Sequence, residues 1–234
     1  MPATKVKSID VKTINNFKQL LSELHTLEIT LPNSKLYKLA TFNSAYIVVT
    51  TAIEKTSSNG QFENPKFIEN FTLSFSQYYF QIINNTLAGD DNIPVAWANL
   101  LTHEKTRRLP NFIYLLLGAN AHINHDLALV MVKLLDNVDT KNLLKDIIKV
   151  DKILTDSSSD ILRTFTETKK FLRFIKNRTN YIYLPIIMHV VLYWRVKAWK
   201  DYLSIKNSGL SPDRAQIKGQ AMSNRLLQLG KLLS

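Results

Sequence analysis

The chain contains no cysteine, and among its 234 residues only 6 are glycine and 7 are proline. The lack of cysteine excludes disulfides, thiolate nucleophiles and cysteine-ligated zinc, so any metal must be held by histidine and carboxylate ligands. Few glycines and prolines, with 45% hydrophobic residues, exclude the disordered and fibrous classes. Because the length suits one domain with a substantial core, we expect a single domain over residues 1–234.

The chain also lacks segments suited to export or to crossing a membrane. The N-terminal residues contain no apolar run of the kind a secretory signal needs, so we expect a cytoplasmic protein. Two stretches are apolar, Phe112–Leu135 and Tyr181–Val196. The first has polar residues at its midpoint, and the second is shorter than the roughly 20 residues needed to span and contains Pro185. We therefore predict two buried helices and no membrane span.

The positive charge is confined to one part of the chain. Residues 1–139 contain 12 Lys/Arg and 12 Asp/Glu, whereas residues 140–234 contain 18 and 7, which accounts for the net charge of +11. Such asymmetry is typical of a basic surface that meets an acidic partner, or of lysine-rich helix faces exposed to water. No nucleic-acid-binding motif accompanies the charge, so nucleic acid is not the expected partner.

Capping residues and prolines at helix-start positions predict an all-α fold of about nine helices, with no strand and no repeat. The β-branched run Ile47–Thr51 is assigned to a buried helix because its flanks continue a helical pattern. The central helix, opened by Pro110, is predicted to pack against the helix that starts at Tyr181. The predicted helices span approximately Asp10–Leu27, Ser34–Thr56, Asn64–Ala88, Pro94–Leu101, Pro110–Leu135, Thr140–Leu154, Ser157–Phe174, Tyr181–Asn207 and Ser211–Leu229.

A polar cluster interrupts the central apolar helix. His122, His125 and Asp126 are spaced i, i+3 and i+4, which places them on one helix face, and Gly118 lies one turn before them. Buried polar groups need partners, so this face either forms an internal network or faces a site. The other polar residues of the segment are Asn120 and Asn124.

Three interpretations of the cluster are open. It can be a structural network in which Asp126 binds the imidazoles and fixes the register of the core. It can be a site for a divalent metal, with His122, His125 and Asp126 as ligands. It can also carry out metal-free acid–base chemistry, with Asp126 orienting a histidine that moves a proton. The spacing differs from the zinc-peptidase motif, and phosphate-binding loops and nucleophile elbows are absent.

A second candidate region lies near the end of the chain. Arg195 and Trp199 share a helix face at i and i+4. The guanidinium can stack on the indole, or the indole can hold the arginine in place to bind an anionic small molecule. Arg195, Trp199 and Asn124 are therefore the candidate substrate-binding residues.

The segment Leu115–Leu127, with the sequence LLLGANAHINHDL, resembles the hallmark LLLGxNAHINxDL of a largely bacterial family of uncharacterised proteins, domain-of-unknown-function family 5995. Further stretches resemble the family pattern at Phe62–Pro65, Trp97, Asp146–Leu154 and Arg195 with Trp199. The family has Asn and Phe where this chain has Asp151 and Ile147. The resemblance implies a helical fold and favours Asn120, His122 and Asp126 as the essential set, because the position of His125 varies. It implies no particular activity or cofactor.

Two functions from different classes fit these features. The first is a small-molecule enzyme of hydrolase or lyase type, in which Asp126 orients His122, Asn120 places the substrate and Arg195 holds an anionic group. The second is a non-enzymatic binding protein whose polar cluster is core structure and whose basic C-terminal half meets an acidic partner. A site reachable by small molecules favours the first, and a sealed core favours the second.

Overall fold

The computed structural model describes residues 5–90, 93–101, 109–135, 140–163 and 180–208, together with residue 225. These residues are mainly helical and form no strand, which confirms the all-α prediction. The helices are α1 (Phe17–Thr30), α2 (Ala40–Ser58), α3 (Pro65–Ala88), α4 (Val95–Leu101), α5 (Asn111–Ala121), α6 (Leu127–Leu135), α7 (Thr140–Asp156), α8 (Ser158–Arg163) and α10 (Asn180–Ser208). Short 3-10 turns cover Val11–Thr13, Leu31–Asn33 and Tyr37–Leu39.

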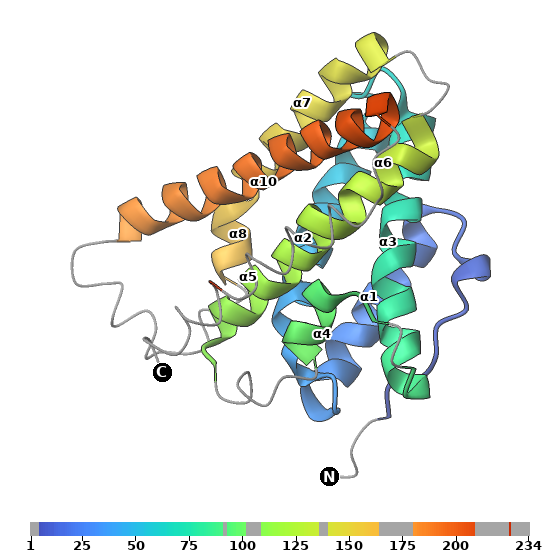
Figure 1. Ribbon diagram of the computed structural model, residues 1–234, viewed down its shortest axis with the longest axis vertical. Helices are drawn as coiled ribbons and strands as arrows, with labels where there is room; N and C mark the ends of the chain where they lie inside the picture. Colours follow the sequence, from blue (N-terminus) through green and yellow to red (C-terminus); the bar gives the residue numbers. More distant parts are fainter. Residues whose placement is uncertain are drawn as a thin grey trace.

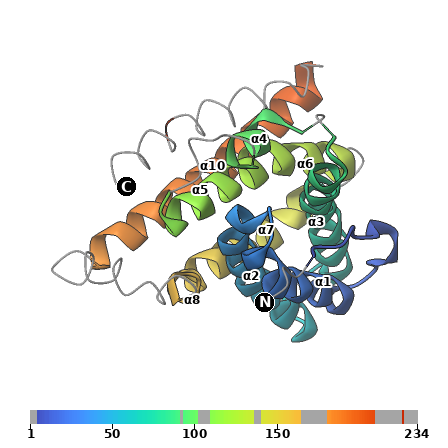
Figure 2. The same ribbon diagram turned by 90° about the horizontal axis from the view of Figure 1, so that it is seen from below.

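The central rod of the molecule is formed by α5 and α6, which are joined by a π-helical turn, η5 (His122–Asp126). Figure 1 shows this rod running diagonally through the protein, with α10 alongside it. In Figure 2, α1, α2 and α3 lie on the other side of the rod. Contacts of α10 with α6 and η5, of α2 with α5 and of α3 with α6 agree with this arrangement. The predicted packing of the central helix against the helix near the end of the chain is therefore confirmed.

The central rod is also the one stretch among the described helices, Asn111–Leu135, that is long and apolar enough to cross a membrane by length and composition. Within its most apolar window, 72% of the residues are buried inside the protein. Such burial is what a helix at the centre of a protein core requires, because its apolar side chains contact other helices on several sides.

Most predicted helix ends agree with the structure, but the first helix does not. The prediction of a helix from Asp10 is wrong, since a short 3-10 turn at Val11–Thr13 is followed by a break before α1 begins at Phe17. The reason is a local cap: the Asn16 side chain accepts a hydrogen bond from the Gln19 backbone N–H at 3.0 Å. The second helix likewise begins later than predicted, at Ala40, after the turn Tyr37–Leu39.

Residues near the end of the chain are partly outside the described structure. The helix predicted to start at Ser157 is described only as α8, and the helix predicted from Ser211 lies outside the described residues. The helix α10 begins at Asn180, before Pro185, so Pro185 does not set its start.

Gly118 packs closely against α2, a helix that contributes residues to the candidate site. A Cβ atom on Gly118 would lie 2.7 Å from Cγ and 2.8 Å from Cβ of Phe42. These atoms are close to the α2 backbone and cannot swing away as a side-chain tip can. The absence of a side chain at Gly118 therefore sets how near α5 comes to α2.

We expect Gly118→Ala to lower the free energy of unfolding by up to about 2 kcal/mol. Forcing an extra methyl into a packed core costs about 1–3 kcal/mol, and the gain in helix propensity of about 1 kcal/mol offsets only part of it. Urea unfolding followed by circular dichroism measures the effect. A rise in stability, as seen for an unhindered glycine inside a helix, would contradict the close approach.

Candidate active site

The candidate site begins with the π-helical turn in the rod. The Leu127 backbone N–H donates to the carbonyl of His122, five residues back, instead of to the residue four back. Such turns widen a helix locally and change the direction of the side chains that follow, and they are frequent at functional sites. Here the turn contains both histidines and Asp126, and all three side chains are buried.

Asp126 is the acceptor at the centre of the cluster. Its carboxylate accepts hydrogen bonds from His122 Nδ1 at 2.9 Å and from His125 Nδ1 at 2.6 Å. The indole Nε1–H of Trp97, on α4, donates to both oxygens at 3.1 and 3.3 Å. Asp126 is only 1% exposed, so these donors replace the water that a buried carboxylate loses. The sequence-predicted association of the two histidines with Asp126 is present.

The charge state of the pair follows from burial and these bonds. Burial by itself raises the pKa of Asp126, but the hydrogen bonds and charges of His122 and His125 outweigh it and hold the pKa below its ordinary value. Burial also lowers the pKa of His122, against the opposing effect of Asp126. An ionised carboxylate accepts only, so a neutral His122 carries its proton on Nδ1 and presents a lone pair on Nε2.

That second nitrogen is the unusual feature of the site. His122 Nε2 is buried and has no hydrogen-bond partner among the described residues. A neutral imidazole with one nitrogen fixed by a carboxylate and the other free is the arrangement a general base requires.

Aromatic side chains surround the His122 ring and form what we call the aromatic cage. Phe75 on α3 stacks on the imidazole, with ring centroids 3.6 Å apart and an angle of 11° between the planes. The other cage members meet it edge to face, at centroid distances of 5.1 Å for Tyr46, 5.5 Å for Phe42, 6.2 Å for Trp97 and 6.4 Å for Tyr79. The cage keeps water away from His122, which is why burial dominates the pKa of the imidazole.

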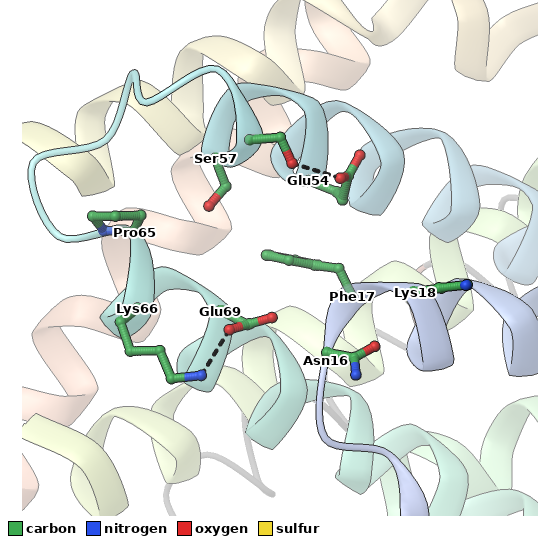
Figure 3. A pocket seen from close by; sticks show the side chains of 9 residues that line it. Asn16, Phe17, Lys18, Glu54, Ser57, Pro65, Lys66 and Glu69 are labelled. Atoms are coloured by element: carbon green, nitrogen blue, oxygen red, sulfur yellow. Dashed lines mark hydrogen bonds and ion pairs between the residues drawn. The ribbon is translucent and has the colours of Figure 1, made fainter.

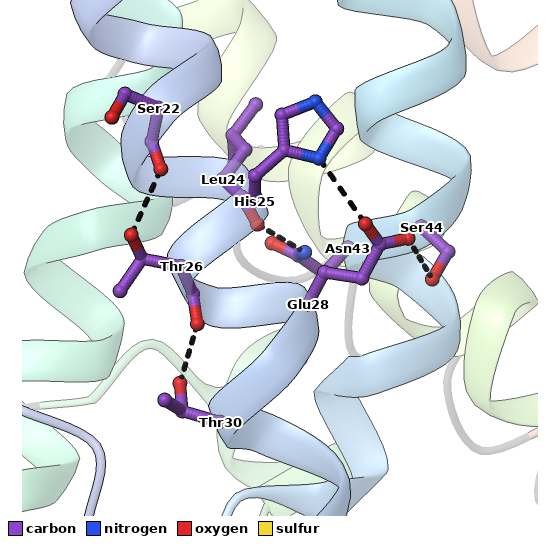
Figure 4. A network of polar contacts seen from close by, with 8 residues as sticks. All are labelled: Ser22, Leu24, His25, Thr26, Glu28, Thr30, Asn43 and Ser44. Atoms are coloured by element: carbon purple, nitrogen blue, oxygen red, sulfur yellow. Dashed lines mark hydrogen bonds and ion pairs between the residues drawn. The ribbon is translucent and has the colours of Figure 1, made fainter.

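A buried asparagine ties the cage to the outer helix α1. Asn43 on α2 is fully buried, donates to the Leu24 carbonyl at 2.9 Å and accepts from the Tyr79 hydroxyl at 3.3 Å. Figure 4 shows the first of these bonds beside the surface contacts of Glu28 with His25 and Ser44. Asn43 thereby holds Tyr79 in place, because its amide satisfies one polar group on α1 and another on α3.

The remaining predicted residues of the segment form a separate pair. Asn124 Nδ2 donates to Asn120 Oδ1 at 2.8 Å, and both side chains are buried. This bond occupies the Asn120 oxygen that would otherwise be offered to a substrate. The substrate roles predicted for Asn120 and Asn124 stay predictions.

Arg195 and Trp199 each contact a different neighbour. Arg195 forms an ion pair with Asp151, which joins α10 to α7, whereas the Trp199 ring lies 5.4 Å from that of Tyr202. The structure does not bring Arg195 into contact with His122 among the interactions of the described residues. Its predicted role in holding an anion stays a prediction.

The metal interpretation also stays a prediction. No group of three or more His, Cys, Asp or Glu side chains among the described residues is arranged to hold a metal ion. In the cluster, both histidine Nδ1 atoms already bind the Asp126 carboxylate, so Asp126 and either Nδ1 could coordinate an ion only after these bonds were broken.

Several stretches that resembled the family pattern meet in the fold. Glu63 and Asn64 donate their backbone N–H groups to the Asp146 carboxylate, at 2.9 and 2.8 Å. Trp97 reaches Asp126, and Asp151 pairs with Arg195. Motifs far apart in the sequence are therefore partners in space.

Sequence reasoning missed the cage around His122. The sequence does contain a pattern that indicates part of the cage. Two pairs of aromatic residues are spaced i and i+4 and so share a helix face, namely Phe42 with Tyr46 on α2 and Phe75 with Tyr79 on α3. The spacing indicates a buried aromatic face, but it does not show which residue the face surrounds.

A separate hollow of about 530 Å³ lies where α1, α2 and α3 meet. Figure 3 shows Phe17 from α1 between Glu54 of α2 and Glu69 of α3. The charged groups there bind neighbours on their own helices, Glu54 to Ser58 and Glu69 to Lys66. The hollow contains none of the site residues predicted from the sequence.

The His122–Asp126 pair predicts a loss of stability in mild acid. The unfolded chain takes up a proton on this histidine near its ordinary pKa of 6.5, whereas the folded chain resists it because its pKa is lowered. The free energy of unfolding therefore falls as the pH drops through 6.5, by up to about 1.4 kcal/mol per pH unit. Asp126, whose folded pKa lies below 3.8, adds a second loss at lower pH.

Urea unfolding between pH 8 and 5 measures this effect in the wild type and in His122→Asn. Asparagine keeps an N–H donor for Asp126 but does not titrate, so the difference between the two curves isolates His122. Parallel curves would contradict a neutral, buried histidine.

The fold and the site define an all-helical protein with a buried histidine–aspartate pair inside an aromatic cage. The chain belongs to the family of unknown function DUF5995, whose family model matches residues 17–234. No curated protein and no solved structure matches the chain.

Proposed function

We propose that the protein is a small-molecule enzyme of hydrolase or lyase type that uses His122 as its general base. The single observation that carries the proposal is the buried, unpartnered Nε2 of an imidazole whose Nδ1–H is fixed by Asp126. A purely structural histidine is expected to have both nitrogens bonded, because each unsatisfied buried polar atom costs about 1–3 kcal/mol.

The roles within the site follow from the contacts. Asp126 sets the tautomer and orientation of His122, and it stabilises the imidazolium that forms when His122 accepts a proton. Trp97 and His125 hold the carboxylate in place through their own donors. The lowered pKa keeps His122 unprotonated at neutral pH, which is the state a base needs.

His122 is only 3% exposed, and a sealed core favours the binding function, so chemical modification tests whether small molecules reach the imidazole. Diethyl pyrocarbonate is a small uncharged reagent that acylates neutral imidazole nitrogens, and peptide mass spectrometry reports the modified histidine. We expect His122 to react in the folded protein, with exposed His25 as the internal standard. Reaction of His122 only after unfolding in urea would overturn the proposal and leave a sealed structural network.

A reactive His122 then directs a substrate screen. Wild type, His122→Asn and Asp126→Asn are compared on panels of small esters, amides and hydroxy compounds, with turnover measured by mass spectrometry. We expect turnover by the wild type and a loss of at least about 100-fold in His122→Asn, in line with the contribution of a general base.

A second candidate function is binding of an acidic protein through α7 and α10. Large apolar side chains are exposed there, namely Leu144 and Ile148 on α7 and Tyr193 and Val196 on α10. Lysines accompany them, and Lys197 Nζ lies 5.5 Å from the centre of the Tyr193 ring. Apolar contacts flanked by positive charge are suited to an acidic surface.

Retention on immobilised poly-glutamate tests this second function. We expect Lys197→Gln with Lys200→Gln to elute at lower salt than a control pair, Lys7→Gln with Lys12→Gln, which removes the same charge elsewhere. Equal elution of the two double variants would show that only net charge matters and would remove the support for this surface.

A further inference from the structure

Two further polar atoms on α2 share the isolation of His122 Nε2. The Tyr46 hydroxyl and Thr50 Oγ1 are buried and, within the described part of the chain, have no hydrogen-bond partner. The two residues are one turn apart and so share a face of α2. The Tyr46 ring centroid lies 5.1 Å from that of His122. Tyr46 is 8% exposed and His122 is 3% exposed.

A protein core selected only for stability would replace these groups. Phenylalanine at position 46 or valine at position 50 would fill nearly the same volume without a buried, unsatisfied hydroxyl. The neighbouring Tyr79 shows the usual solution, because its hydroxyl donates to Asn43. Asn99 Nδ2 and Trp194 Nε1 are also buried and unpartnered among the described residues, but the Tyr46 ring packs directly against His122, where one ligand can supply a partner to both groups.

The chemistry of the surroundings limits what that ligand can be. The charged group that contacts His122 is the Asp126 carboxylate, and the rings packed around the imidazole are aromatic. An anion there would lose its hydration and be repelled by Asp126. The Tyr46 hydroxyl stays protonated because burial and the charge of Asp126 raise its pKa, so it has an O–H to donate to an acceptor on the ligand.

We propose that His122 and Tyr46 together bind a small uncharged carbonyl compound, with the Tyr46 O–H donating to the carbonyl oxygen and His122 Nε2 accepting a proton donor beside it. The proposal rests on the proposed function, and it adds Tyr46 as a substrate-contacting residue and a substrate class. The anionic ligand predicted from Arg195 does not fit this position, since Asp126 repels an anion here.

Acetamide and acetate are the matched probes, because they have nearly the same shape and differ in charge. A long-range ¹H–¹⁵N spectrum of histidine-labelled protein reports Nε2 of His122, assigned by its loss in His122→Asn. We expect acetamide to shift this signal in a saturable way and acetate to leave it unchanged. In Tyr46→Phe, the acetamide affinity is expected to fall by about tenfold, the effect of one lost hydrogen bond.

Stability supplies an independent readout for Tyr46. We expect Tyr46→Phe to raise the melting temperature of the ligand-free protein, since it removes an unpartnered hydroxyl. The control is Tyr202→Phe, which removes a buried hydroxyl that donates to the Leu135 carbonyl at 3.3 Å. This control is expected to lower the melting temperature and to leave the acetamide response unchanged.

Each outcome bears on the inference. Acetate binding as well as acetamide overturns the uncharged class, and a lowered melting temperature in Tyr46→Phe shows a structural hydroxyl. No shift with either probe also overturns the inference. The pyrocarbonate reaction of His122 is measured separately, so failure here is distinguishable from failure of the proposed function.

Discussion

Asp126→Ala is expected to lower the free energy of unfolding by about 3–5 kcal/mol, the largest effect of any single substitution considered for this protein. The change leaves the Nδ1–H groups of His122 and His125 and the indole N–H of Trp97 without their acceptor in a buried place. Removing one partner of a buried charged network costs this much because the groups left behind are not hydrated. Urea unfolding monitored by tryptophan fluorescence and circular dichroism measures the change.

The control for Asp126 is another aspartate that lacks these surroundings. Asp156 on α7 pairs with Lys152, but both side chains are mostly exposed, at 66% and 72%. We expect Asp156→Ala to change stability by no more than about 0.5 kcal/mol. Equal effects of the two substitutions would mean that the carboxylate of Asp126 is not the organising acceptor of the core.

Asp146→Ala is expected to cost about 2–4 kcal/mol through a different contact. Asp146 projects from α7, is fully buried, and accepts from the backbone N–H groups of Glu63 and Asn64. The Asn64 side chain adds a third bond at 3.3 Å. These donors lie at the start of α3, where free N–H groups and the helix dipole favour a negative charge. Truncation leaves these partly buried N–H groups without their acceptor.

Glu63→Ala is the matched control for Asp146. The Glu63 side chain pairs with Lys145 at the surface, so its removal keeps the buried carboxylate and breaks only an exposed ion pair. We expect little change in urea unfolding. If Asp146→Ala were equally mild, the link between α7 and the start of α3 would contribute little to holding α3 in place.

The fold class could be read from the sequence because its signals are local. Asn64 before Pro65 predicts the start of α3, and Gly89, with φ of 74°, ends it in the left-handed conformation that favours glycine. The same kind of local signal gave the wrong start for the first helix, where both Asp10 and Asn16 offer a cap. Where two caps lie a few residues apart, the start of the helix depends on which apolar residues reach the core.

The site could be predicted only in part. Spacing alone predicted that His122, His125 and Asp126 lie together, since residues three or four apart on a helix are neighbours whatever surrounds them. The π-helical turn was not predicted, because it depends on how the rod fits its neighbours. The ion pair of Arg195 with Asp151, which lies on another helix, was not predicted. A contact between distant segments of the chain cannot be predicted from local residue spacing.

The sequence by itself determined that the chain is helical, that its core helix contains a polar face, and that Asp126 lies beside two histidines. These properties follow from side-chain periodicity and capping, which act over a few residues. Only the tertiary structure decided that aromatic residues of α2, α3 and α4 surround His122 and that its Nε2 and the Tyr46 hydroxyl remain without partners among the described residues. The reason is physical: the pKa and hydrogen bonding of a buried group are set by everything packed around it, and packing joins residues far apart in the chain.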